Sequence, residues 1–415
     1  MRHPERRVTE PKDLGILMNM NLQKIKLGEV CRFINGRAYS QPELLDSGKY
    51  KVLRVGNIFE GNHWYYSDME LDDDKYCNEG DLLYSWACTF GPYIWHGPKT
   101  IYHYHIWKVE PNQSLVDKHF LYYFLNHQTK GFMGSTHGST MIHITKENME
   151  NFEVLLPSLS DQKKIASVLS ALDDKIALNK KMNQKLEAMA KRLYDYWFVQ
   201  YDFPDKNGHP YKTTGGKMEY NETLKREIPE GWNDGALSDI ANITMGQSPD
   251  GASYNEDGEG MIFYQGSTDF GMRFPTVRQY TTAPTRFAKK GDILMSVRAP
   301  VGAVNIANTD CCIGRGLSAL NSKLGSLSHL YFLIDVFKKT FENKNTVGTT
   351  FGSITKDELY ALPVVIPDKK VIEQFEKMAK PIFDRQMKLG EESNRLIKLR
   401  DKLLPLLMNG QVEVK

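Results

Sequence analysis

The chain has 415 residues, 41% of them hydrophobic and 25% charged, which is typical of folded globular proteins and long enough for two or three domains. Its 53 Lys and Arg residues nearly balance 51 Asp and Glu residues, so the net charge of +2 neither indicates nor excludes a nucleic-acid partner. The five cysteines form no C-x-x-C pair and no stretch is apolar enough to span a membrane, so we expect reduced thiols and a cytoplasmic location.

Residues 1–20 are polar and lack the apolar run of a signal peptide. We expect a flexible leader here, and Met20 is an alternative to Met1 as the start of the protein. The folded part is expected to begin near residue 21.

The most informative feature of the chain is an internal repeat. Residues 136–146 have the sequence THGSTMIHITK, and residues 346–356, at an offset of 210, have TVGTTFGSITK. An offset of 211 pairs the segment 79–85 with 290–296. A unit of about 210 residues is too long for a solenoid repeat, so each copy should be a folded domain with its own core.

Each copy begins with short β-like runs bounded by Gly, Asp and Asn. They lie at 50–55 and 80–85 in the first copy and at 260–264 and 291–297 in the second. A helical segment follows at 119–125 and again at 329–334, then a T-x-G-[ST]-T loop and an Ile-Thr-Lys turn before a last strand. We therefore predict two similar domains of mixed strands and helices, at 21–158 and 234–367.

Each domain is followed by a long segment with apolar residues at heptad spacing, at 159–198 and at 368–410. The apolar seam consists of Ile165, Leu169, Leu172, Ile176, Leu186, Leu193, Phe375, Ile382, Leu389, Leu396 and Leu403. Because neither helix can leave this stripe in water, we expect the two to pack on each other. The linker at 199–233 lets the chain return, so the helices should lie antiparallel with one domain at each end. A helix of this length, roughly 50 Å, is expected to act as a spacer.

Four polar residues interrupt the seam, namely Asn179, Asn183, Gln386 and Ser393. Buried without partners they would cost stability, whereas a buried Asn can fix the register and the partner of a helix pair. A third helix supplied by another protein could also cover them.

The sequence lacks the motifs of the common enzyme classes. It has no phosphate-binding loop, no nucleophile elbow, no H-E-x-x-H and no amino-methyltransferase tetrapeptide. We therefore expect a non-catalytic protein that binds no metal or cofactor of its own. The pair His103-x-His105 could chelate a metal, but the neighbouring Tyr104 and Trp107 favour surface contacts or packing.

Several motifs in a fixed order make the sequence recognisable. They are G-Q-S-P at 246–249, K-G-D-I-L-M-S-V-R-A-P-V-G at 290–302, G-R-G-L at 314–317 and I-P-E-G-W at 228–232, beside the repeated T-x-G-[ST]-T and I-T-K. Together with the duplication and the heptad helices, this order resembles the specificity subunit of type I restriction-modification systems, from about residue 21 to 410.

The resemblance implies an α+β fold with two mixed α/β target recognition domains, separated by two long antiparallel coiled-coil helices and related by a pseudo-twofold duplication. It implies a bacterial or archaeal protein that binds double-stranded DNA at a bipartite target, one half-site per domain. It also implies that the helices hold two methyltransferase subunits, with restriction subunits outside them. S-adenosylmethionine, ATP and Mg are expected on those partners, which methylate adenine and cleave DNA.

Loops at corresponding positions of the two copies are the candidate DNA contacts, led by Arg, Asn and Gln because their side chains can donate to or bridge base edges. Small hydroxyl residues in the T-x-G-[ST]-T loops are candidates for phosphate contacts, with a purely structural turn as the alternative. Arg298 and Arg315 lie among glycines and are either salt-bridged surface residues or donors to a phosphate or a guanine edge. The candidates are Asn35, Arg37, Tyr39, Arg54, Asn57, Ser85, Trp86, Thr89, Ser139, Thr140, Gln247, Ser248, Tyr264, Gln265, Ser296, Arg298, Arg315, Thr349 and Thr350.

Two other functions fit the same features. One is a stand-alone tandem-domain regulator that binds DNA without methyltransferase partners. The other is an assembly scaffold whose Tyr- and Trp-rich loops bind protein. Co-purification with a methyltransferase subunit would exclude the first, and a steep loss of DNA affinity with salt would exclude the second.

Overall fold

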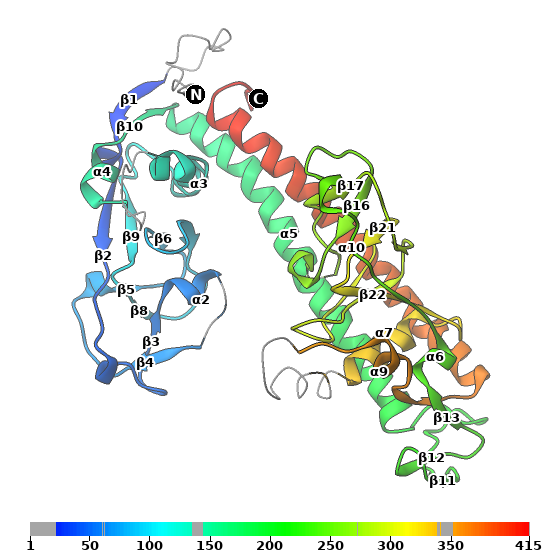
Figure 1. Ribbon diagram of the computed structural model, residues 1–415. Helices are drawn as coiled ribbons and strands as arrows, with labels where there is room; N and C mark the ends of the chain where they lie inside the picture. The colour runs from blue at the N-terminus through cyan, green and yellow to red at the C-terminus, as the bar shows by residue number, and fades with distance from the viewer. Residues whose placement is uncertain are drawn as a thin grey trace. The chain divides into compact units, whose positions relative to one another are not determined.

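The computed structural model describes residues 22–59, 61, 63–134, 144–271, 273–337, 341 and 352–414. The leader and both T-x-G-[ST]-T loops, with the candidates Ser139, Thr140, Thr349 and Thr350, lie outside these residues. The chain divides into two compact units, one with residues up to 176 and from 396 onward, the other with residues 177–395. Each unit contains one copy of the repeat and part of both long helices (Figure 1).

The first domain is built on two four-stranded sheets. One has the order β2-β9-β6-β7, with β2 at Cys31–Asn35, β9 at Ile106–Pro111, β6 at Leu82–Ser85 and β7 at Gly91–Ile94. The other has the order β4-β3-β8-β5, with β4 at Tyr65–Ser67, β3 at Tyr50–Leu53, β8 at Thr100–Tyr102 and β5 at Tyr76–Cys77. The strands β1 (Gln23–Lys26) and β10 (Glu153–Leu156) pair and join the two ends of the domain. Its helices are α1 (Leu27–Val30), α2 (Val55–Phe59), α3 (Lys118–Gly134) and α4 (Lys146–Asn151), with short 3-10 turns η2 (Gln41–Glu43) and η3 (Asp73–Lys75).

The second domain contains two equivalent sheets, the second of which has one additional edge strand, β15 (Tyr254–Asn255). One has the order β14-β22-β19-β20, with β14 at Ala241–Met245, β22 at Leu317–Ser322, β19 at Ile293–Ser296 and β20 at Val304–Ile306. The other has the order β15-β17-β16-β21-β18, with β15 at Tyr254–Asn255, β17 at Gln279–Thr281, β16 at Met261–Tyr264, β21 at Cys311–Ile313 and β18 at Phe287–Ala288. The end strands are β13 (Asn233–Ala236) and β23 (Pro363–Ile366), and a hairpin of β11 (Met218–Asn221) and β12 (Arg226–Pro229) precedes them. Its helices are α6 (Leu237–Ile240), α7 (Leu327–Val336) and α9 (Lys356–Tyr360), with η5 (Gly251–Ser253) and η6 (Ser267–Asp269).

The predicted internal duplication is confirmed by the strand orders. The order β14-β22-β19-β20 repeats β2-β9-β6-β7, and β17-β16-β21-β18 repeats β4-β3-β8-β5. In both domains one pair of the second sheet is parallel, β3 with β8 and β16 with β21, whereas its other pairs are antiparallel. A shared parallel pair inside an antiparallel sheet is a specific topological feature, so the two copies have one fold.

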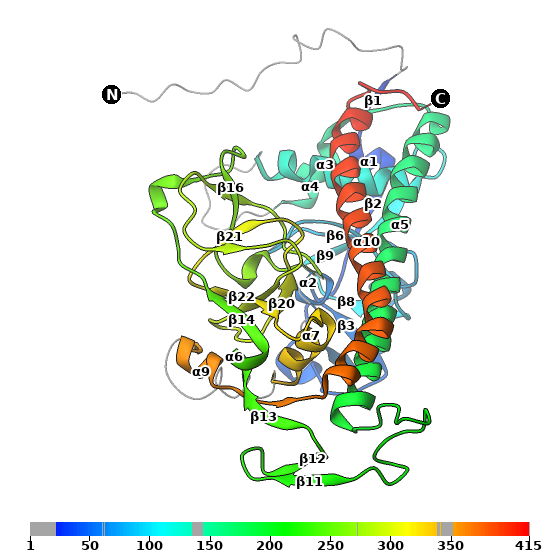
Figure 2. The same ribbon diagram turned by 90° about the vertical axis from the view of Figure 1, so that its right-hand side faces the viewer.

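In each domain the helix that the sequence predicts packs against the first of the two sheets. The segment predicted at 119–125 lies inside α3, which is adjacent to β7. The segment at 329–334 lies inside α7, which is adjacent to β22 (Figure 2). Buried aromatic side chains such as Phe33, Trp107 and Phe120 fill the core of the first domain, each at most 2% exposed. The strand predicted at 50–55 is shorter than expected, because the Asn57 Oδ1 accepts a 2.9 Å hydrogen bond from the Arg54 backbone N–H and turns the chain into α2.

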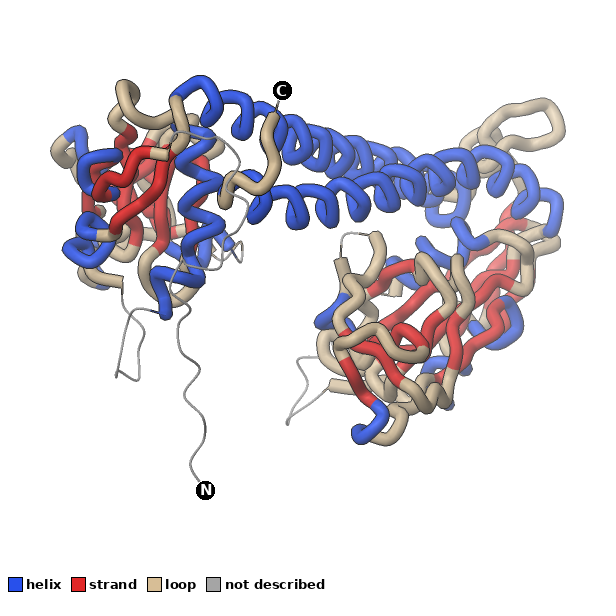
Figure 3. The backbone as a smooth tube through the Cα atoms, turned by 90° about the horizontal axis from the view of Figure 1, so that it is seen from above, coloured by secondary structure: helices blue, strands red, loops and turns tan. Residues whose placement is uncertain are grey.

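The two long helices are α5 (Leu159–Tyr194), which ends in a π-helical turn at Asp195–Val199, and α10 (Lys369–Met408). They run side by side in opposite directions (Figure 3). Within the first unit the Asp173 carboxylate is 2.8 Å from the Arg400 guanidinium, and within the second the Asn179 amide donates to Glu392 at 2.9 Å. The eleven apolar seam residues are all buried or half-buried. No helix in the described part of the chain is long and apolar enough to cross a lipid bilayer.

The polar residues of the seam are only partly paired. Asn179, Asn183 and Gln386 are at most 3% exposed, and Ser393 donates back to the Leu389 carbonyl at 2.8 Å. The Asn179 Oδ1, both amide atoms of Asn183 and the Gln386 Oε1 are buried without a hydrogen-bond partner among the described residues. Buried polar atoms without partners lower the stability of the helix pair. We therefore infer that these residues serve to fix the register of the two helices.

Candidate nucleic-acid interface

Three loops of the first domain meet where its two sheets adjoin. We call residues 35–37, 53–57 and 102–106 the first loop platform. The Arg37 backbone N–H donates to the Tyr102 carbonyl at 3.1 Å, and the His103 N–H donates to the Leu53 carbonyl at 2.9 Å. A Cβ at Gly36 would lie 2.3 Å from the Tyr102 carbonyl oxygen, so the close approach of these loops requires glycine at that position.

The second domain has an equivalent second loop platform at residues 245–248, 264–266 and 313–317. The Gln247 N–H donates to the Ile313 carbonyl at 3.0 Å, and the Gly314 N–H donates to the Tyr264 carbonyl at 2.9 Å. A Cβ at Gly246 would lie 2.2 Å from the Gly314 carbonyl oxygen. The two platforms thus share one backbone arrangement, and their side chains differ.

Equivalent positions can be assigned from the strand registers and these shared hydrogen bonds. Arg37 corresponds to Gln247 and Arg54 to Gln265. The tripeptide His103-Tyr104-His105 corresponds to Gly314-Arg315-Gly316. The first platform therefore presents imidazole and aromatic groups where the second presents a guanidinium flanked by glycines.

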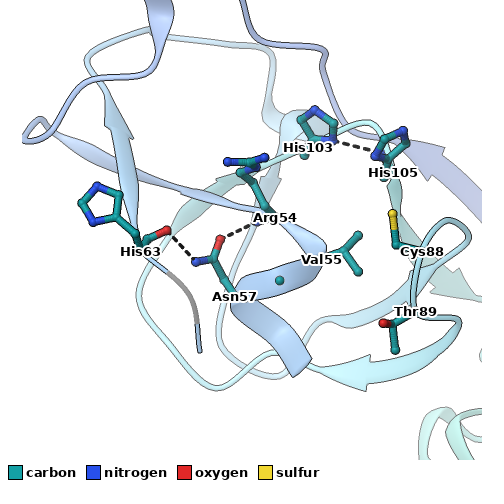
Figure 4. Close-up of a pocket in the computed structure, with 9 residues that line it drawn as sticks. Arg54, Val55, Asn57, His63, Cys88, Thr89, His103 and His105 are labelled. Atoms are coloured by element: carbon teal, nitrogen blue, oxygen red, sulfur yellow. Dashed lines mark hydrogen bonds between the residues drawn. The ribbon is translucent and has the colours of Figure 1, made fainter. Parts of the chain in front are cut away.

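The first loop platform opens into a cavity of about 410 Å³ (Figure 4). Its lining residues are Arg54, Val55, Gly56, Asn57, His63, Cys88, Thr89, His103 and His105. Three of the sequence candidates, Arg54, Asn57 and Thr89, are thus brought together with two histidines that were weighed for a different role.

The charge state of this cavity follows from its contacts. The Arg54 guanidinium is exposed and lies 5.3 Å from the centre of the Tyr65 ring. Burial, with smaller effects from His105 and Arg54, lowers the pKa of His103 to about 4, so its ring is neutral at pH 7. The His103 Nδ1 accepts from the His105 backbone N–H at 3.4 Å, which leaves the hydrogen on Nε2 as a donor.

On the second loop platform three sequence candidates contact one another. The Gln265 Nε2 donates to the Ser248 Oγ at 3.1 Å, and the Arg315 backbone N–H donates to the same oxygen at 3.3 Å. The side chains of Gln247, Gln265 and Arg315 are exposed. A Cβ at Gly316 would lie 2.7 Å from the Gln265 carbonyl, so the glycines let the Arg315 loop approach closely.

Three candidates are wrong because their side chains are buried. Tyr264 is 0% exposed and belongs to the core of its domain. Ser85 and Ser296 are 1% and 2% exposed, and each hydroxyl donates within its own turn, to the carbonyls of Ala87 and Arg298. These serines shape the turn after an equivalent strand in both domains and are not available to DNA.

Of the remaining candidates, Asn35 and Arg37 belong to the first loop platform itself, and Tyr39, Trp86 and Arg298 lie outside the platform residues. Arg37 is paired with Glu43 at 2.6 Å and lies over the Tyr39 ring, and this pairing lowers the pKa of Glu43 to about 2. Trp86 is half-buried, stacks on Trp107 and donates through Nε1 to the Tyr104 carbonyl at 2.9 Å. Asn35 and Arg298 are exposed.

The structure also bears on metal binding at the histidines. Among the described residues no group of three or more His, Cys, Asp or Glu side chains is arranged to hold a metal ion. His103 and His105 are ring neighbours, 4.7 Å between centroids, on the wall of the cavity. A comparison of the two copies at the 211-residue offset would have assigned both histidines to the platform, since they replace the glycines beside Arg315.

The chain thus contains two copies of one α+β domain. Each copy has a loop platform of polar side chains and is continued by one of two antiparallel helices. This arrangement defines a two-domain recognition protein. A protein-family model for the type I restriction modification DNA specificity domain matches residues 19–188 and again 229–399. The chain belongs to this family and is a type I specificity subunit with two target recognition domains.

Individual relatives agree with this assignment. A protein of Methanocaldococcus jannaschii, provisionally named the MjaX specificity subunit of a type I restriction enzyme, is 30% identical over 74% of this chain and 71% of its own length. The HindI specificity subunit of Haemophilus influenzae is 23% identical over 94% of this chain and 99% of its own length. The crystal structure of the S subunit of a type I restriction-modification system from M. genitalium has the same fold, with a TM-score of 0.58, 15% identity and coverage of 94% and 96% of the two chains.

Proposed function

We propose that this specificity subunit binds double-stranded DNA at a bipartite target, with the first domain on one half-site and the second domain on the other. The observation that carries the proposal is that one backbone platform occurs twice with different side chains. A scaffold that was only structural would have no reason to vary its exposed groups and keep its buried hydrogen bonds. Two different sets of donors on the same backbone suit two different base sequences.

The two platforms offer different recognition chemistry. The first has the Arg54 guanidinium, the His103 Nε2–H and the Thr89 hydroxyl around a cavity, together with exposed Tyr104. The second has the guanidinium of Arg315 and the amide of Gln265, with Arg298 nearby in sequence after β19. Guanidinium and amide groups can contact purine edges in the major groove in bidentate fashion, whereas imidazole and hydroxyl groups donate or accept singly.

The helix pair supplies the partner contacts and the spacing in this proposal. We propose that it fixes the unread spacer between the half-sites, and that it holds two methyltransferase subunits with restriction subunits outside them. α5 alone, with 36 residues, is roughly 54 Å long and exceeds the helical turn of about 34 Å that separates neighbouring major-groove sites on one face of B-DNA. S-adenosylmethionine, ATP and Mg then belong to those partners, and the partners carry out the catalysis.

The test is the adenine methylation pattern of the source cell with and without this gene. Loss of methylation at one two-part, asymmetric sequence with a fixed spacer is the expected result. Co-purification of the tagged chain with a methyltransferase subunit should accompany it. An unchanged methylation pattern, together with DNA binding by the isolated chain, would favour the stand-alone regulator instead.

A further inference from the structure

One arginine of the second domain is almost completely buried against the long helices of its unit. Arg273 lies between η6 and β17, and its side chain is 4% exposed. Its Nη1 is 2.9 Å from the Glu187 Oε2 of α5. Its guanidinium carbon lies 4.7 Å from the centre of the Tyr331 ring on α7 and 4.5 Å from that of the Phe383 ring on α10.

The carboxylate that binds Arg273 also ties the two long helices together. The Gln386 Nε2 of α10 donates to the same Glu187 oxygen at 2.7 Å and to the Asn183 carbonyl of α5 at 3.3 Å. We call Arg273, Glu187, Tyr331, Phe383 and Gln386 the Arg273 cluster. It joins α5, α10 and the second domain at one point, wholly inside the second unit.

The loop that carries Arg273 is itself fixed to the sheet of the second domain. The Ile306 N–H donates to the Arg273 carbonyl at 3.0 Å, and the Asn305 side chain bonds both backbone groups of Gly271 at 2.9 and 3.0 Å. Phe274 lies directly on α10, since a Cβ at Gly390 would be 2.3 Å from its ring. The backbone that carries the Arg273 side chain is therefore fixed to β20 and its sheet.

Burial of this charge is not an efficient way to stabilise the contact. Its Nε and Nη2 are buried without a hydrogen-bond partner among the described residues. Replacement of a buried ion pair by well-packed apolar groups is often neutral or stabilising. What the guanidinium adds is geometry, because it contacts two rings that meet nearly at right angles, 5.5 Å apart, while it is bonded to a fixed carboxylate, and this permits one orientation, whereas an apolar contact permits sliding.

We propose that Arg273 is a positioning residue that fixes the second recognition domain on the helix pair, and thereby sets how strictly one spacer length is selected. In the first unit the domain contacts the helix pair differently, through the Tyr123 hydroxyl, which donates to Asp173 of α5 at 2.7 Å, while Asp173 pairs with Arg400 of α10. The cluster is thus a property of the second domain. The inference rests on the proposed bipartite recognition.

The experiment uses the full chain with its co-expressed methyltransferase partners and DNA duplexes that carry both half-sites at spacers varied one base pair at a time. Arg273→Met keeps an apolar contact with the two rings but removes the ion pair with Glu187 and the cation–π contacts. We expect unchanged half-site sequences and a preference for the best spacer over its neighbours that is reduced about tenfold. Arg273→Lys, which keeps the charge and loses the planar guanidinium, should give an intermediate profile.

The matched control is Arg278→Ala, because Arg278 also pairs with a carboxylate of the second domain, Asp269, but with a 56% exposed side chain outside the cluster. It should leave the spacer profile unchanged. Glu187→Gln tests the same contact from α5 and covers the case in which the Met variant does not fold. If the wild-type complex shows no spacer preference, the proposed function itself fails. If the wild type is selective and both cluster variants keep its profile, or lose the second half-site altogether, the positioning role is wrong.

Discussion

The two recognition domains share a backbone and differ in what that backbone presents. Their sheets have the same strand orders, and their loop platforms have the same hydrogen bonds between loops. The first platform carries His103-Tyr104-His105 beside a cavity, and the second carries Gly314-Arg315-Gly316 on an open surface. The buried hydrogen bonds and the glycines Gly36 and Gly246 therefore define the scaffold, while the exposed side chains are free to specify the target.

The domains also differ in their attachment to the long helices. In the first unit the Tyr123 hydroxyl of α3 donates to Asp173 of α5 at 2.7 Å, and Asp173 pairs with Arg400 of α10. In the second unit the corresponding polar contacts are made by the Arg273 cluster, which involves a loop as well as α7. The two copies of the domain thus have two unlike junctions with the helices, and each can be disturbed separately.

The largest effect is expected from lengthening the helix pair without touching either domain. Insertion of seven residues after Ile176 in α5 and seven before Leu396 in α10 keeps the Asp173–Arg400 and Asn179–Glu392 pairs intact. Each helix gains about 10.5 Å, equivalent to roughly three base pairs. Affinity for the original spacer should fall about a thousandfold, toward non-specific binding, and a target with the longer spacer should recover it.

The control for the double insertion is the chain with the α5 insertion alone. This single insertion leaves seven residues of α5 without a matching segment in α10 and shifts the register of one helix against the other. It should lose binding at every spacer. Selection of bound sequences from a spacer library gives the answer, and retention of the original spacing by the doubly lengthened chain would exclude the spacer role of the helices.

A smaller effect, confined to one half-site, is expected from the platform glycines. In Gly246→Ala the new Cβ would lie 2.2 Å from the Gly314 carbonyl oxygen, so the second loop platform must open. We expect discrimination at the second half-site to fall about a hundredfold and recognition of the first to be unchanged. Gly36→Ala should do the converse. Gly251→Ala, in the same domain but with open space around the new Cβ, is the matched control.

Single exposed side chains should matter less than the scaffold beneath them. Gln265→Ala and Arg298→Ala should each cost about 1–3 kcal/mol at the second half-site and leave the first unaffected. Competition binding against duplexes mutated in one half-site at a time measures both. Equal weakening on all sequences would reassign the residue to a phosphate contact.

The comparison also explains what the sequence could and could not predict. The repeat, the seam of the long helices and the covering helices α3 and α7 follow from local apolar patterns that packing does not alter. The loop platforms do not follow from local patterns, because they depend on hydrogen bonds between loops that are distant in sequence. Tyr264 was a candidate as a loop residue, but β16 continues through it into the core, so the equivalent of Arg54 is Gln265.

The histidines are a second case in which the local sequence pattern does not show what a side chain does. His103 and His105 suggest a chelating pair in the sequence, but the structure places them with Arg54 on the wall of one cavity. In the sequence Ser85 and Ser296 resemble polar residues at loop tips, yet the hydroxyl of each donates a hydrogen bond within its own turn. Burial and bonding of short polar side chains depend on tertiary contacts and are not encoded in a local pattern.

The smallest effect is a pH dependence that should distinguish the two domains. His329 of α7 is 2% exposed, its ring lies 4.6 Å from that of Phe198, and burial lowers its pKa to about 3. In the first domain His119, in the first turn of α3, is exposed. Because the unfolded histidine titrates near pH 6.5, the unfolded chain binds one more proton between pH 6.5 and 3, so His329 lowers stability as the pH falls through that range.

The variant His329→Leu should therefore lose less stability in acid than the wild type, by about 1–2 kcal/mol in the free energy of unfolding at pH 5. His119→Leu is the control that should follow the wild-type curve in thermal unfolding between pH 7.5 and 5. Parallel curves for all three proteins would mean that α7 admits water at His329, and that the buried environment of this helix is not maintained in solution.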